Sequence, residues 1–99
     1  MPFEVMVGLH VTDRDAYQEY RRGMLPILES YGGGFRYDFV VSEVLKADVS
    51  HPINRVFAIF FPDRVTHDRF YADPAYLGVR NNYHSRSVAA RVVIAEYER

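Results

Sequence analysis

The apolar side chains follow a strand pattern in four segments of the chain. Between residues 3 and 11 every second position is apolar, at Phe3, Val5, Val7, Leu9 and Val11. Residues 35 to 46 alternate in the same way, and residues 53 to 61 are apolar on both faces after Arg55, which is typical of a central strand. A last segment covers about residues 88 to 97. The period of two, with many β-branched and aromatic residues, predicts four β-strands.

Other segments show a helical period instead. After the first predicted strand, large side chains recur at steps of three and four residues: Tyr17, Tyr20, Met24, Leu28 and Tyr31. This spacing predicts an amphipathic helix from about 13 to 31, with Thr12 as its N-cap and a kink near Pro26. After the third strand we expect a short helix from 63 to 71 and a further helix from 73 to about 84, each starting at an aspartate.

Three consecutive glycines, residues 32 to 34, follow the first predicted helix. Glycines that cradle a phosphate stand between a strand and a following helix, because only that order aims helix N–H groups at the anion. Here the helix comes first, and no Lys-Ser/Thr pair follows. The glycines are therefore predicted to end the helix, where a residue with positive φ is commonly needed.

The order strand, helix, strand, strand, helix, strand predicts an α+β fold of the ferredoxin-like βαββαβ type in a single domain, residues 1–99. Its four-stranded antiparallel sheet would carry the helices on one face. We assign the odd-numbered positions of the first two strands to that face. The opposite face would then include Met6, Gly8, His10, Arg36, Asp38 and Val40, which is too apolar to be left in water. We expect it to be buried against a second copy in a homodimer, as a dimeric α/β barrel.

Composition narrows the function classes. The chain has 99 residues, a net charge of -1 and no cysteine, which excludes disulfides, a thiolate nucleophile and cysteine-ligated zinc. Basic and acidic residues are interspersed, so no basic stripe suggests nucleic acid. The first residues carry no basic leader, and their apolar run is broken by Glu4 and His10. We expect a soluble cytoplasmic protein with no nucleic-acid or membrane partner.

Three stretches carry a family resemblance over nearly the whole chain: VTDRDAYQEYRRGMLPILESYGGGF, NRVFAIFFPD and FYADPAYLGVR. They resemble the small dimeric α+β barrel proteins and, more narrowly, the bacterial family known as the domain of unknown function numbered thirteen-thirty. The resemblance implies the fold and a dimer. Relatives in the wider superfamily include cofactor-independent monooxygenases, lactone isomerases and haem enzymes. The family often has Glu before the tyrosine of the third stretch, where this chain has Ala75.

Three polar residues of the first two strands are candidates for catalysis. His10 lies near the end of its strand, where it could act as a general base or remain a structural histidine bonded to a carbonyl or to the dimer partner. Arg36 and Asp38 are two residues apart and should project to the same face. They could anchor an anionic or enolate-like ligand, with Arg36 as the clamp, or simply pair with each other.

A second group of candidates comes mostly from the segment FYADPAYLGVRNNYHSRS. It contains Tyr71, Arg80, Tyr83 and His84, a mixture that would suit a planar or acidic small molecule and would equally suit a solvated helix edge. We predict Tyr71, Arg80 and Tyr83 as ligand-binding residues and His84 as a catalytic one. Tyr17, in the first turn of the first helix, either packs in the core or points its hydroxyl into a pocket.

No metal or cofactor is predicted. The histidines at 10, 51, 67 and 84 form no HxH or HxxxH pair. The first hypothesis is a homodimer that binds a small aromatic or acidic compound between sheet and helices, as a cofactor-independent monooxygenase or isomerase. A histidine would take a proton, and arginine and tyrosine would hold the oxyanion. The alternative is a non-catalytic structural or regulatory dimerisation domain, which predicts a filled interior.

Overall fold

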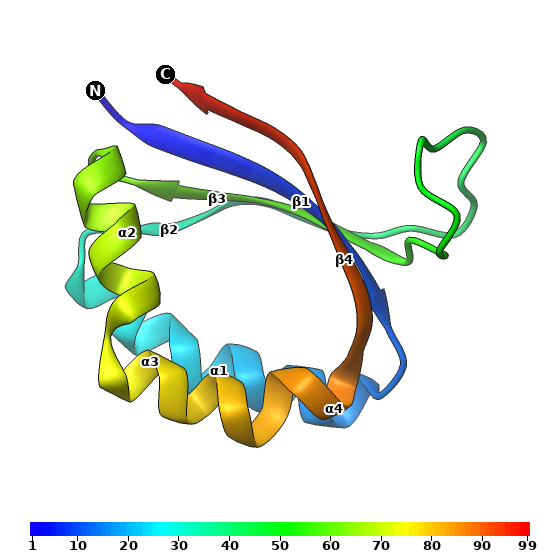
Figure 1. The fold of residues 1–99 in the computed structure, drawn as a ribbon, viewed down its shortest axis with the longest axis horizontal. Coiled ribbons are helices and arrows are strands. Elements are labelled where there is room, and N and C mark those ends of the chain that lie inside the picture. Colours follow the sequence, from blue (N-terminus) through cyan, green and yellow to red (C-terminus); the bar gives the residue numbers. More distant parts are fainter.

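A computed structural model describes residues 1–99. Its strands are β1 (Phe3–Val11), β2 (Gly34–Val40), β3 (Arg55–Phe61) and β4 (Val88–Glu98). Its helices are α1 (Arg14–Ser30), α2 (Arg64–Ala72), α3 (Pro74–Val79), a π-helical turn η1 (Arg80–His84) and α4 (Ser85–Ser87). The sheet has the order β2-β3-β1-β4, and all neighbouring strands are antiparallel. All helices cover the same face (Figure 1), so the predicted α+β ferredoxin-like architecture is confirmed.

The helices cover what we call the inner face of the sheet. Alternate residues of β1, from Phe3 to Val11, point to this face and are buried. They pack against the buried stripe of α1, formed by Tyr17, Tyr20, Met24 and Leu28. The odd-numbered positions of β1 therefore lie on the helix side, as the alternation predicts.

Of the two predicted ends of α1, the C-terminal glycine cap is confirmed, whereas the N-cap lies one residue later than predicted. At the C-terminal end Gly32 has φ of +76°, and the Gly33 N–H donates to the Leu28 carbonyl at 3.0 Å, so the glycines end the helix. At the N-terminal end the cap is Asp13, whose carboxylate accepts from the Ala16 N–H at 3.0 Å. The predicted cap, Thr12, is wrong because Asp13 occupies the cap position, while the Thr12 hydroxyl faces the Ser87 carbonyl instead of the first turn of α1.

A β-bulge in β2 overturns the predicted face of its side chains. Phe35 pairs with Ile59, but the next paired residue is Tyr37, opposite Ala58, so Arg36 is the extra residue. After a bulge the alternation resumes one position later. Asp38 therefore lies on the inner face, while Arg36 lies on the other face of the sheet, the outer face. The prediction that Arg36 and Asp38 share a face is wrong for this reason.

The same shift reverses the predicted faces of Tyr37, Phe39 and Val40. Tyr37 and Phe39 lie on the outer face, and their rings stack at 5.8 Å between centroids. Val40 pairs with Arg55 on the inner side. The outer face is thus more aromatic than predicted.

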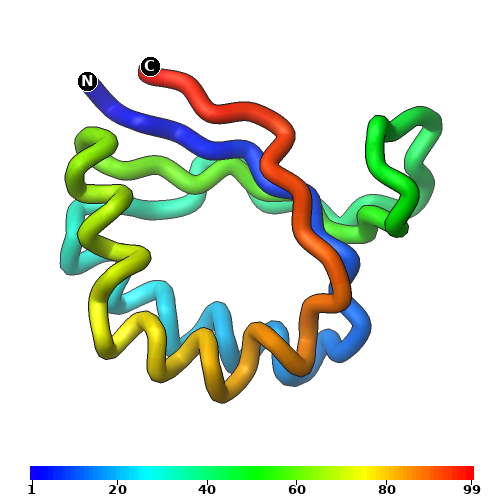
Figure 2. Tube along the Cα trace, viewed as in Figure 1, coloured from blue at the N-terminus to red at the C-terminus, as the bar shows by residue number.

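Two further segments differ from the sequence-based expectation. The second strand ends at Val40 rather than at residue 46, and residues 41–54 form a loop that projects from the body of the molecule (Figure 2). The predicted helix over 73–84 is divided into α3 and the π-helical turn η1. None of the helices combines the length and apolar character needed to cross a membrane.

Candidate functional site

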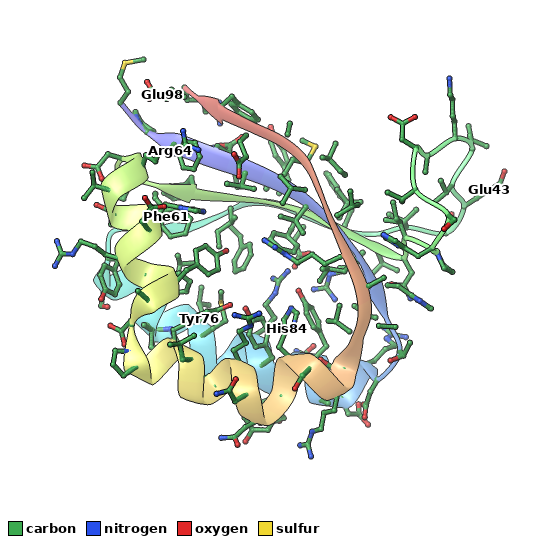
Figure 3. All side chains as sticks on the ribbon, viewed as in Figure 1. Glu43, Phe61, Arg64, Tyr76, His84 and Glu98 are labelled. Atoms are coloured by element: carbon green, nitrogen blue, oxygen red, sulfur yellow. The ribbon has the colours of Figure 1, made fainter.

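A cavity of about 450 Å³ lies between the inner face of the sheet and the helices. It is lined by 19 residues, of which 12 are hydrophobic, and its volume is within the range of small-molecule sites. The apolar wall comes mainly from the sheet and α1, for example Val5, Ile59, Phe35 and Met24. The polar lining comes from η1, β4 and α2 as well as α1. Side chains of the helical layer, including those of Tyr76 and His84, point toward this space (Figure 3).

A pair of buried tyrosines forms the floor of the cavity on the helix side. The hydroxyls of Tyr20 on α1 and Tyr76 on α3 are 2.8 Å apart and hydrogen bond to each other. Burial raises the pKa of both phenols, so both stay protonated at neutral pH. This bond satisfies the two hydroxyls and joins α1 to α3.

His84 stands beside this tyrosine pair. Its ring lies edge-on to the ring of Tyr20, at 4.9 Å between centroids, and its imidazole makes no hydrogen bond within the chain. Burial, together with the positive charges of Arg80 and Arg91, lowers the pKa of His84 to about 4. The imidazole is therefore neutral at neutral pH and has one donor and one acceptor available to the cavity.

Arg80 and Arg91 line the cavity on opposite layers, one on η1 and one on β4. Neither makes an ion pair, a side-chain hydrogen bond or a cation–π contact. The hydroxyl of Tyr71, on α2, also lacks a hydrogen-bond partner within the chain. These three side chains thus offer free hydrogen-bond donors to the cavity.

The two acidic residues of the lining are both engaged. A carboxylate oxygen of Asp68 lies 2.9 Å from the ring nitrogen Nδ1 of His67. Glu96 lies 3.5 Å from a guanidinium nitrogen of Arg64. Both partners belong to α2, at the opposite end of β4 from Arg91. The acids therefore do not neutralise Arg80 or Arg91.

Asp38 lies behind the cavity wall in a charged cluster. Its carboxylate accepts from Arg21 at 3.0 Å and from Arg55 at 2.8 Å, and Arg21 also donates to the hydroxyl of Tyr17 at 2.9 Å. Burial raises the pKa of Asp38, but the two arginines outweigh it and hold this pKa below its ordinary value. Arg21 and Tyr17 line the cavity, so Asp38 positions them rather than facing the space itself.

Arg36 belongs to a separate cluster on the outer face. Its Nε donates to Glu4 at 2.6 Å, and Arg99 and the hydroxyl of Tyr97 donate to the same carboxylate. Only 3% of the Glu4 side chain is exposed. Burial raises the pKa of Glu4, but the hydrogen bonds from Tyr97, Arg36 and Arg99 outweigh it and leave the pKa below its ordinary value.

The predicted site residues are therefore divided. Four of them line the cavity: Tyr17, Tyr71, Arg80 and His84. Four lie outside its lining: His10, Arg36, Asp38 and Tyr83. His10 pairs with Ala90 on the outer face, and Tyr83 packs against the core with Arg86 over its ring.

Sequence reasoning missed Arg91 as a site residue. The available signal was its place in the last strand, two residues before Val93, which also lines the cavity. The alternation assigns faces only in the first two strands, so it does not include Arg91. No group of three or more His, Cys, Asp or Glu side chains is placed to hold a metal ion.

Comparisons with known proteins give a family and a fold. The model of the family described as "Domain of unknown function (DUF1330)" matches residues 5–97. Among solved structures, the protein of unknown function RPA0582 from Rhodopseudomonas palustris is 18% identical, with a TM-score of 0.80 over 99% of this chain and 82% of that chain. No curated protein matches the chain.

Two further structures share the fold at lower identity. A dabb family protein with a ferredoxin-like fold from Mesorhizobium loti is 14% identical, with a TM-score of 0.70 over 99% of this chain and 96% of that chain. A dimeric ferredoxin-like protein of unknown function from Jannaschia sp. is 12% identical, with a TM-score of 0.62 over 100% of both chains. At these identities the likeness concerns the fold alone.

Proposed function

The chain belongs to the DUF1330 family, and from this premise we propose that it binds a small organic molecule in the cavity between its sheet and its helices. The observation that carries the proposal is the cavity of about 450 Å³, which joins a mainly apolar wall to a few polar groups around His84. Ligand sites commonly combine these two kinds of lining. A filled interior would instead have favoured the purely structural or regulatory dimer.

The proposal is tested by filling the cavity. Val93 lines it from β4 and is 40% exposed, so phenylalanine can replace it without disturbing the core. Phenols, quinones and small acids are screened for those that raise the melting temperature of the wild-type chain. We expect Val93→Phe to abolish or strongly reduce these shifts. Val65→Phe on α2, at a 68% exposed position outside the lining, should keep them. Equal shifts in both variants would contradict binding in this cavity.

We further propose that two copies associate through their outer faces. Tyr37 and Phe39 are 55% and 54% exposed there, a large apolar area for a free surface. The relative from Jannaschia sp., described as dimeric, supports this by analogy of fold. Phe39→Asp is expected to convert a dimer into a monomer in sedimentation analysis, and Val65→Asp is not. A wild-type monomer at micromolar concentration would refute the proposal. The cytoplasmic location expected from the sequence stays a prediction.

A second candidate function is proton transfer, because His84 is neutral and stands among free donors. In an isomerisation, its imidazole would take a proton from the carbon beside a carbonyl group, and the electron pair would move to the carbonyl oxygen. Arg80, Arg91 and the Tyr71 hydroxyl would hold the resulting enolate until the proton returns at another position. In a cofactor-independent monooxygenase the enolate would itself reduce dioxygen: one oxygen atom would bond to the carbanion carbon, whose CH₂ group would become a carbonyl group, and the other oxygen atom would leave as water.

The keto–enol conversion of phenylpyruvate, an aromatic acid with an acidic carbon, tests this second function. We expect the chain to accelerate the conversion and His84→Gln to lower the rate at least roughly a hundredfold, the lower end of what a general base usually contributes. His10→Gln, on the outer face, should leave the rate unchanged. A rate that depends on His10 and not on His84 would count against the cavity as the reaction site.

A further inference from the structure

We propose that the molecule bound in this cavity carries a carboxylate or a similar oxyanion, which completes the pair formed by Arg80 and Arg91. The inference rests on the proposed function, since it names the chemical class of the ligand. It identifies an aromatic monocarboxylate as the kind of compound to which the cavity is best matched.

The first argument comes from the carboxylate partners of other arginines in the chain. On the outer face two arginines, Arg36 and Arg99, meet at the carboxylate of Glu4. On the inner face two more meet at the carboxylate of Asp38, at 3.0 and 2.8 Å. In both places one acid joins two guanidinium groups, an arrangement that charge-assisted hydrogen bonds strengthen.

The third pair has no acid. Arg80 and Arg91 both line the cavity that His84 also lines. Neither has an anionic partner in the chain. The place that Glu4 and Asp38 fill in the other two clusters is open to a ligand here.

The second argument comes from the hydrogen-bonding groups that remain free in the cavity. The two arginines and the Tyr71 hydroxyl can all donate, and the neutral imidazole of His84 can donate through one nitrogen. The acids of the lining, Asp68 and Glu96, are engaged with partners on α2. A cationic ligand would therefore meet two unneutralised arginines, whereas an oxyanion beside them would meet the donors of Arg80, Arg91 and Tyr71.

The rest of the lining indicates what the anion is attached to. Twelve of the lining residues are hydrophobic, and aromatic rings of Phe35, Phe57 and Tyr71 are among them. Such a wall favours a flat apolar body. The volume of about 450 Å³ suits a compound of one or two fused rings that bears one acidic group.

The experiment compares an acid with its uncharged amide of the same shape. Naphthalene-2-carboxylate and naphthalene-2-carboxamide are titrated into the full chain by calorimetry at pH 7.5 and low salt. We expect the carboxylate to bind at least roughly tenfold more tightly than the amide, because only the carboxylate can form charge-assisted hydrogen bonds with both guanidinium groups.

Variants then assign the difference to the two arginines. Arg80→Gln and Arg91→Gln should each lower the affinity for the carboxylate by roughly three- to tenfold, as expected for exposed charges. The affinity for the amide should stay within about twofold of the wild-type value. Arg80→Lys keeps the charge and should restore part of the affinity. Arg14→Gln, at the exposed first residue of α1, makes the same change of charge outside the cavity and should change the affinity for neither compound.

Each outcome decides between the two proposals. Equal binding of acid and amide, or carboxylate affinity that survives both arginine substitutions, overturns the inference and leaves the cavity as a binding site. Binding of neither compound, together with a wild-type chain that responds to no member of the phenol, quinone and acid screen, overturns the proposed function and the inference with it. Loss of carboxylate binding in Arg14→Gln as well would show a general effect of charge and also refutes the clamp.

Discussion

The Glu4 cluster on the outer face of the sheet and the pair Arg80 and Arg91 in the cavity each contain two arginines, but they differ in what those arginines contact. On the outer face, Glu4 accepts from Arg36 and Arg99 and is almost fully buried. In the cavity, Arg80 and Arg91 contact no carboxylate and are exposed. The first cluster is complete within the chain, whereas the second is not.

This difference separates groups that stabilise the fold from groups that are free to act. A buried carboxylate is costly unless all its hydrogen bonds are made, so the Glu4 cluster must form when the chain folds. Exposed arginines without partners contribute little to stability. Charged residues of one type therefore have different roles on the two faces. Substitutions of Glu4, of His84 and of the two cavity arginines, in order of decreasing expected effect, test this conclusion.

The largest effect is expected from the outer cluster. Glu4→Gln keeps the shape of the side chain but removes the charge that Arg36 and Arg99 contact. We expect the free energy of unfolding to fall by about 2 kcal/mol, less than for a fully buried ion pair because both arginines are partly exposed. Urea unfolding at pH 7 measures it. Glu43→Gln, on the projecting loop (Figure 3), is the matched control and should change it by less than about 0.5 kcal/mol.

The same variant has a pH signature. The pKa of Glu4 is lowered from its ordinary value of 4.5, so its contribution to stability is complete above pH 4.5 and is lost as the pH falls through the lowered value. Wild-type stability should therefore fall more steeply below pH 4.5 than that of Glu4→Gln. Parallel curves for the two chains would mean that the Glu4 cluster does not stabilise the fold.

The sequence predicts the strands of this fold well where the alternation is unbroken. From Phe3 to Val11 the alternation continues without interruption, and the predicted helix side is the observed one. In β2 the alternation looks equally regular, yet Arg36 is an extra residue and reverses the faces that follow it. A bulge depends on the pairing with β3, which the pattern within a single strand does not record.

Apart from Tyr17 on α1, the predicted residues that line the cavity all come from one stretch of the chain. Tyr71, Arg80 and His84 lie within fourteen residues of the chain and do meet at the cavity. Arg91 arrives from β4, across the sheet, and no local spacing connects it with Arg80. The sequence predicted His10 and Arg36 for the site because their chemistry was suitable, but both lie on the outer face, to which the alternation itself assigns them.

A smaller effect is expected from His84. Its pKa is lowered from 6.5 to about 4, so between these values the unfolded chain binds a proton at this residue and the folded chain does not. Stability is then independent of His84 above pH 6.5 and falls as the pH decreases from 6.5 to 4. His84→Gln should lose about 1 kcal/mol less than the wild type over this range, allowing for the partial exposure of the ring. Urea unfolding across this pH range gives the difference, and equal losses would contradict the neutral imidazole.

The smallest effect on stability is expected from the arginines of the cavity, and it is the most direct test of the comparison. Arg80→Gln and Arg91→Gln remove no ion pair, so each should leave the free energy of unfolding at pH 7 within about 0.5 kcal/mol of the wild type. Each should also raise the pKa of His84, because both charges lower it. Histidine titration by NMR measures that shift. A loss above about 1 kcal/mol in either variant would mean that these arginines support the fold as Arg36 and Arg99 do, and the distinction between the two faces would fail.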